Sequence, residues 1–180
     1  MKKDLEEKIM SLDKDLGKMG LKIELVVVGG AAFVLKGLIE RSTEDIDHLN
    51  AVHSIASTLL KKYNVNRRVI AFETTFGDWK YDIIPLSTNA KNIALKTISN
   101  ERLLAARMFS NKRYEDIIES FKNMNASIDQ EKFEDILLEL IEYNNPIFIS
   151  EFRDNKYLID ELYKARGWNE TENTKRIRES

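Results

Sequence analysis

Apolar residues follow a helical spacing at the start of the chain. Five of them recur every three or four positions: Leu5, Ile9, Leu12, Leu16 and Met19. This repeat predicts an amphipathic helix over residues 3–19. Residues 23–28 then form a run rich in β-branched residues and leucine, in which apolar and polar positions do not alternate. Such a run is typical of a strand buried on both faces. The strand stops at Gly29-Gly30, and helix formers after it predict a short helix that ends at Gly37.

Strand-like alternation returns after a polar loop. Residues 45–49 alternate as a short strand does, and Asn50 can cap a helix that continues to Tyr63. Residues 68–75 and 79–86 are rich in β-branched and aromatic residues, and Gly77-Asp78 between them is a turn signal. These segments predict a β-hairpin.

Helical spacing dominates the rest of the chain beyond residue 95. We expect helices over residues 98–110, 113–124, 130–144 and 150–166. Asp129 and Ser150 are candidate N-caps, and Gly167 is a candidate stop. The predicted fold class is therefore α/β of the α+β kind, with a small mixed sheet over residues 1–90 and a C-terminal helical bundle over residues 91–180.

Composition narrows the possible functions of the 180 residues. The chain has no cysteine, which excludes disulfides, thiolate metal sites and a cysteine nucleophile. Its net charge is -2 and basic residues are spread over both halves, which disfavours a nucleic-acid-binding accessory protein. No apolar run is long enough to span a membrane, and the first residues do not resemble a signal peptide. We expect a soluble, cytoplasmic protein.

The Asp45-Ile46-Asp47 segment is the first candidate for chemistry. In a strand, residues two apart point to the same face about 7 Å apart, so the two carboxylates would lie side by side. Such like charges repel unless a cation is shared between them, and Mg²⁺ favours hard oxygen ligands. Many Asp-x-Asp pairs are merely solvated, so this motif needs a second feature in support.

The Gly29-Gly30 corner supplies that feature. A buried strand that ends in two glycines before a helix presents backbone N–H groups and a positive helix dipole with no Cβ in the way. The sequence lacks both the P-loop and the dinucleotide-binding fingerprints. The corner alone is also compatible with simple close packing, but neighbouring strands could bring it and the aspartates into one cleft.

Together these residues resemble the nucleotidyltransferase superfamily, which has the polymerase-beta-like fold. Its signature is an apolar strand, Gly-Gly or Gly-Ser, a spacer and Asp-x-Asp in a second strand; here fourteen residues separate Gly30 from Asp45. The chain is similar to small bacterial nucleotidyltransferases of uncharacterised or abortive-infection and toxin type, in which Arg-x-Thr precedes the carboxylates, as Arg41 and Thr43 do here. Asp82 matches the third carboxylate of the family, with Glu73 as the alternative.

The resemblance implies transfer of a nucleoside monophosphate from a nucleoside triphosphate to an acceptor hydroxyl, with two Mg²⁺ (or Mn²⁺) ions as cofactors. Asp45, Asp47 and Asp82 would be the catalytic and metal-binding residues. The residues expected to hold the nucleotide are Gly29, Gly30, Arg41, Thr43, Arg107 and Lys112. The active cleft would lie between the two halves of the chain.

Several alternatives stay open at this point. The acceptor could be RNA, a protein or a small molecule. A non-catalytic nucleotide-binding or regulatory module, such as half of a toxin–antitoxin pair with an antitoxin partner, is the second hypothesis. His48 and His53, the two histidines, have no third ligand at a spacing that suits zinc, and we expect His48 to face away from the site.

Overall fold

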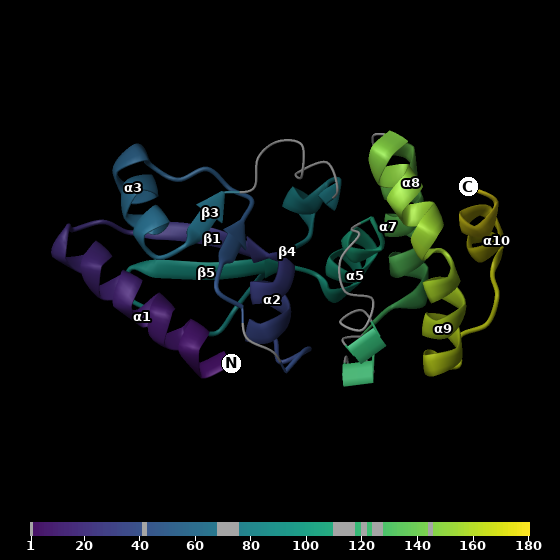
Figure 1. Cartoon of the computed structure of the whole chain (residues 1–180), viewed down its shortest axis with the longest axis horizontal. Helices are drawn as coiled ribbons and strands as arrows, with labels where there is room; N and C mark the ends of the chain where they lie inside the picture. Colours follow the sequence, from purple (N-terminus) through teal and green to yellow (C-terminus); the bar gives the residue numbers. More distant parts are fainter. Residues whose placement is uncertain are drawn as a thin grey trace. The chain divides into compact units, whose positions relative to one another are not determined.

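The chain folds into two compact units, each of which is described by itself. The computed structural model describes residues 2–40, 43–67, 76–109, 118–119, 122–123, 128–143 and 146–180. The first unit contains the described residues up to 67 and residues 80–98. The second unit contains residues 76–79 and the described residues from 99 onward (Figure 1).

A mixed β-sheet forms the centre of the first unit. The strands that the described residues contribute are β1 (Ile23–Val28), β2 (Ile46–His48), β3 (Val65–Arg67), β4 (Ile83–Pro85) and β5 (Ile93–Ile98). Their order in the sheet is β3-β2-β1-β5-β4. Strand β1 pairs antiparallel with β2 and parallel with β5, so it is the central strand. Strand β3 pairs parallel with β2, and β4 pairs antiparallel with β5, which makes β3 and β4 the edges.

Three helices pack with this sheet: α1 (Lys2–Lys18), α2 (Gly29–Leu35) and α3 (Ser54–Lys62). Helix α1 contacts both α2 and α3, so the three form one layer (Figure 1). The buried face of α1 carries Leu5, Ile9, Leu12 and Leu16. The helix, strand and short helix predicted at the start of the chain are thus confirmed, and so is the predicted α+β fold class.

Strand β5 corrects the sequence-based picture of the middle of the chain. The predicted hairpin partner of residues 79–86, residues 68–75, lies outside the described residues. Residues Trp79–Tyr81 form a 3-10 turn rather than a strand, and β4 is paired with β5, which had not been predicted. The predicted boundary at residue 90 therefore falls too early, because β5 belongs to the sheet.

Helices make up the described part of the second unit. They are α5 (Asn100–Met108), α7 (Gln130–Tyr143), α8 (Pro146–Asn155), α9 (Tyr157–Arg166) and α10 (Glu172–Glu179). The single helix predicted over 150–166 is two helices, so Ser150 is no N-cap, whereas Asp129 Oδ1 does accept a hydrogen bond from the Lys132 N–H. Gly167 ends α9 with a φ of 65°, as predicted. Most of the helix predicted over residues 113–124 lies outside the described residues. Among the described residues, no helix is long and apolar enough to span a membrane.

An ion pair between buried Arg102 and half-buried Glu139 fixes residues 76–79 within the second unit. The two terminal nitrogens of the Arg102 guanidinium, Nη1 and Nη2, donate to Oε1 and Oε2 of Glu139, at 2.8 and 2.9 Å. Arg102 also donates to the Phe76 carbonyl, and Glu139 Oε1 accepts from the Asp78 N–H. Paired geometry of this kind is what a buried charge requires. The segment is therefore tied to α5 and α7 through its backbone.

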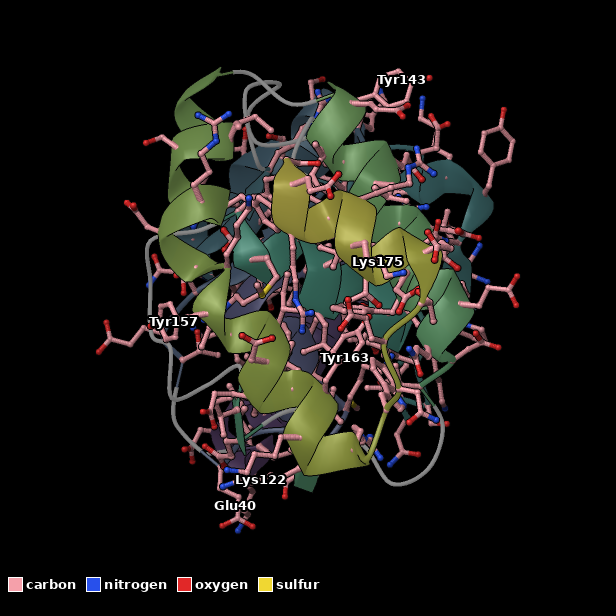
Figure 2. The ribbon with its side chains drawn as sticks, turned by 90° about the vertical axis from the view of Figure 1, so that its right-hand side faces the viewer. Glu40, Lys122, Tyr143, Tyr157, Tyr163 and Lys175 are labelled. Carbon is pink, nitrogen blue, oxygen red and sulfur yellow. The ribbon has the colours of Figure 1, made fainter. Side chains whose placement is uncertain are left out.

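A second polar cluster attaches α10 to the rest of this unit. Glu134 on α7 is 1% exposed, and its carboxylate accepts hydrogen bonds from the hydroxyls of Tyr163, Thr171 and Thr174. Figure 2 shows Tyr163 beside α10, the helix that carries Lys175. Burial and the bond to Glu134 raise the pKa of Tyr163 above its ordinary value. The C-terminal helix is thus bound through a buried carboxylate as well as through the apolar side chain of Ile177.

Gly77 is predicted to be intolerant of any side chain. Its φ is +51°, and an added Cβ would lie 2.0 Å from Glu139 Oε1. Gly77→Ala should therefore lower the free energy of unfolding by the cost of a strained φ, about 1 kcal/mol, plus about 1–3 kcal/mol of overpacking. Gly167→Ala is the matched control, because Gly167 has a φ of +65° with open space around it. Equal losses in urea denaturation of the two variants would contradict this account.

The raised pKa of Tyr163 predicts a loss of stability at alkaline pH. Above pH 10.0, the ordinary pKa, the unfolded state releases the tyrosine proton while the folded state keeps it. Stability should then fall by up to about 1.4 kcal/mol for each pH unit until the folded pKa is reached. Tyr163→Phe should remove this part of the slope, measured by urea denaturation between pH 9 and 11. The exposed Tyr143→Phe is the control, and an unchanged slope in Tyr163→Phe would refute the assignment.

Candidate functional site

The predicted glycine corner and Asp47 of the predicted carboxylate pair meet where β1 ends. Helix α2 begins at Gly29, directly after Val28, the last residue of β1. The antiparallel register sets Val28 opposite Asp47 on β2. Residues directly opposite one another point to the same face. Asp47 therefore shares the face of Val28, at the point where the chain turns into α2.

Gly29 adopts a conformation that only glycine adopts without strain. Its φ is +64°, whereas Gly30 has no positive φ. A Cβ on Gly29 would lie 3.3 Å from Asp47 Oδ2, which is closer than ordinary van der Waals contact. The glycine thus does two things at once: it allows the turn from strand to helix, and it lets a carboxylate approach the backbone.

Asp45 lies one residue before β2 and is exposed, whereas Asp47 is buried. The Thr43 hydroxyl lies 3.1 Å from Asp45 Oδ1 and 3.2 Å from the Asp45 carbonyl oxygen, so its proton is shared between two acceptors. Lys8 on α1 donates to the carbonyl of Glu44. Thr43 and α1 together hold the loop that enters β2. Arg41, the other predicted residue of this loop, lies outside the described residues.

Asp82 is not brought to the aspartate pair. It immediately precedes β4, and both β5 and β1 lie between β4 and β2. Three strand spacings of about 4.8 Å separate these strands by about 14 Å, which exceeds the reach of two carboxylates to one cation. Within the described ranges, no group of three His, Cys, Asp or Glu residues could hold a metal ion. Glu73, the alternative third carboxylate, lies outside those ranges.

The remaining predicted nucleotide-binding residues belong to other parts of the chain. Arg107 lies in the last turn of α5, in the second unit, and is half-buried. Lys112 lies outside the described residues. The predicted roles of Arg107 and Lys112 in nucleotide binding are therefore supported by the sequence resemblance alone.

His48 and Asn50 contribute contacts that the sequence did not reveal. His48 sits opposite Val27, on the other face from Asp47, and is 1% exposed. Its Nδ1–H donates to the Asn50 carbonyl at 2.9 Å, and burial lowers the pKa of its imidazole. The predicted orientation of His48 away from the aspartates agrees with this register. Asn50 is not the cap of α3; His53 holds that position, and the side chain of Asn50 is bonded to β1.

A groove in the first unit lies apart from this corner. It has a volume of about 1040 Å³ and is lined by α1, including Glu6 and Met10, and by residues 85–89, which begin at the last residue of β4. Leu35 and Leu95 also line it. None of the aspartates and glycines of the corner does so, and the groove is therefore a separate feature of this unit.

Comparison with known proteins decides the family. Residues 5–176 match the model of a family described as "Nucleotidyltransferase of unknown function (DUF6036)". The chain belongs to this nucleotidyltransferase family. Neither the curated proteins nor the solved structures gave a match. The resemblance to nucleotidyltransferases that the glycine corner and the aspartates indicated is thereby confirmed.

In this member of the nucleotidyltransferase family, Gly29 is predicted to tolerate substitution by alanine less well than Gly30. Gly29→Ala should lower the free energy of unfolding by about 1–2 kcal/mol, because a non-glycine residue is strained at a φ of +64°. The same substitution should displace Asp47 Oδ2 by a few tenths of an ångström. Gly30→Ala is the matched control: Gly30 is helical, where alanine is favoured by up to about 1 kcal/mol. Urea denaturation that ranks the two variants in the opposite order would contradict the geometry.

Proposed function

We propose that this protein transfers a nucleoside monophosphate from a nucleoside triphosphate to an acceptor hydroxyl, with Mg²⁺ or Mn²⁺ as cofactor. The observation that carries the proposal is the 3.3 Å between Asp47 Oδ2 and the Cβ position of Gly29, in a chain of a nucleotidyltransferase family. Because Gly29 has no side chain, a cation held by Asp47 would lie close to the backbone at the start of α2, where one phosphate could contact both the cation and backbone N–H groups. Neither feature alone would support this function.

The donor set of the corner suits a hard divalent cation. Mg²⁺ takes oxygen ligands and usually uses one or two carboxylates together with water and substrate phosphates. Asp47 is 7% exposed and Asp45 is exposed, so the pair offers one anchored ligand and one that can adjust. When bound, the cation would neutralise triphosphate charge and orient the reacting phosphate. We assign one cation to this pair, since a second would need a further ligand.

The chain's own residues have distinct roles in this scheme. Asp45 and Asp47 hold the cation, and the Thr43 hydroxyl donates a hydrogen bond to the exposed Asp45 carboxylate. Backbone N–H groups at Gly29 and Gly30 bind the phosphate oxygens. The acceptor oxygen forms a bond to the α-phosphorus as the bond to the β-phosphate oxygen breaks. Pyrophosphate leaves, and the proton of the acceptor hydroxyl goes to solvent water.

A non-catalytic nucleotide-binding module is the second candidate. It is favoured by one observation: the described residues bring no third carboxylate to the pair. Such a module would bind a nucleoside triphosphate with Mg²⁺ but would release no pyrophosphate in the presence of any acceptor. Calorimetric binding without turnover would select this alternative.

The first experiment asks whether transfer occurs and to what. The purified full chain is incubated with each α-³²P-labelled nucleoside triphosphate, Mg²⁺ and a cell extract, and pyrophosphate release is measured in parallel. We expect the label to appear in a defined RNA, protein or small molecule. Label transfer that is unchanged by chelation of divalent cations with EDTA would contradict the assigned cofactor.

Substitution of single aspartates tests the assigned ligands. Asp45→Asn and Asp47→Asn should each lower transfer by more than about 100-fold. Loss of a residue that only hydrogen-bonds to a metal ligand already lowers metal affinity or activity by about 10- to 100-fold. Asp82→Asn is the matched control and should lower transfer by less than about 10-fold, given its distance in the sheet. Circular dichroism and melting temperature check folding. A larger loss in Asp82→Asn than in Asp45→Asn would overturn this assignment.

A further inference from the structure

The position of Asp47 depends on a very short strand. Strand β2 has three residues, and its ladder with β1 contains two residue pairs, Val27 with His48 and Val28 with Asp47. A slip of one residue turns every side chain of a strand to the opposite face. In β2 such a slip would set His48 or Ile46 opposite Val28 and turn Asp47 to the opposite face of the sheet. Something must therefore fix this register.

The side chain of Asn50 extends the ladder beyond the end of β2. The Leu49 N–H donates to the Val26 carbonyl at 3.0 Å, which is the last backbone bond on this side. Asn50 Oδ1 then accepts from the Val26 N–H at 2.8 Å, and Asn50 Nδ2 donates to the Glu24 carbonyl at 2.8 Å. A carboxamide has the same donor and acceptor as a peptide group. The carboxamide of Asn50 thus makes the hydrogen bonds to β1 that a longer β2 would have made.

The backbone of Asn50 is held from β2 at the same time. Its carbonyl accepts from Nδ1 of the buried His48. His48 belongs to β2, while Val26 and Glu24 belong to β1. Asn50 therefore links the two strands from both its backbone and its side chain. Either neighbouring register would move the carboxamide away from the two β1 groups that it satisfies.

We propose that Asn50 is a positioning residue that fixes the register of β2 on β1 and so holds Asp47 beside Gly29. Loss of the carboxamide leaves a buried β1 N–H without its partner and removes two of the bonds that define the register. Strand β2 can then shift on β1, and the Asp47 carboxylate no longer stays at the corner. As a statement about catalysis, this proposal rests on the proposed function.

The test compares Asn50→Ala and Asn50→Asp with Asn89→Ala. Asn50→Asp keeps the acceptor for the Val26 N–H but places an oxygen against the Glu24 carbonyl. Asn89 is the matched control, because it is an exposed asparagine of the same unit that follows β4, and both β5 and β1 lie between β4 and β2. In ¹⁵N NMR spectra of the full chain, we expect altered shifts at Gly29 and Asp47 and at least 10-fold faster exchange of the Val26 amide in both Asn50 variants. Asn89→Ala should leave them unchanged.

Transfer supplies the second measurement, at a temperature at which each variant is folded. Both Asn50 variants should lower kcat by about 10- to 100-fold and raise the Mg²⁺ concentration for half-maximal rate, as loss of a partner behind a metal ligand does. A residue that only stabilises the fold would lower the melting temperature and leave kcat and the Mg²⁺ requirement at their wild-type values. That outcome, or unchanged Gly29 and Asp47 shifts, would overturn the proposal.

The two proposals fail in different ways. If the wild-type chain transfers no nucleotide with any acceptor, the proposed function fails, while the Gly29 and Asp47 shifts still decide whether Asn50 sets the register. If Asn50→Ala does not fold, Asn50→Asp answers the same question through the same amide signals. Wild-type shifts in Asn50→Asp would then refute the role of the carboxamide.

Discussion

Burial of β1 on both faces is the constraint on which the first unit depends. Residues Leu25–Val28 are at most 1% exposed, so their backbone groups have no access to water. Every N–H and C=O of such a strand needs a partner within the protein. Strand β5 supplies the partners along one side, and Thr97 adds its hydroxyl to the Val27 carbonyl. The other side is shared between β2 and the carboxamide of Asn50. The place of Asp47 is thus a consequence of how β1 satisfies its backbone.

The pattern of neighbouring residues predicted those elements that are determined by neighbouring residues. The apolar repeat of α1, the unbroken run of β1 and the glycine that ends α9 could all be found in a few neighbouring residues. Strand β5 could not, because its partner is β1, far earlier in the chain. The alternation of Ile93, Leu95 and Thr97 was a strand signal, but it is short and is followed directly by the helical spacing of α5. Tertiary pairing outweighed propensity there.

The residues of the candidate site also differ in whether nearby sequence or distant strand pairing determines their position. Gly29 directly follows β1, and Asp47 belongs to β2, the next strand in the chain, so the sequence could anticipate that they meet. Asp82 was assigned by its motif, but the pairing of β4 with β5 decides its place, and no nearby residue announces that pairing. Asn50 follows a strand and precedes a helix, a position that favours a cap. Its bonds to β1 arise only once β1 and β2 are side by side, so local sequence had no means of revealing them.

The shortness of β4 has a consequence for the protein in solution. An exposed strand edge invites pairing with a second chain, and long, flat edges are the usual starting points of aggregation. Among the strands of the described residues, β4 lies at one end of the sheet order, has three residues and ends in Pro85, which has no N–H to donate. A strand from another molecule would find few bonds along β4 to offset the entropy of being held there. The apolar centre of the sheet can therefore extend as far as β4 without offering a long template for a second molecule at this side.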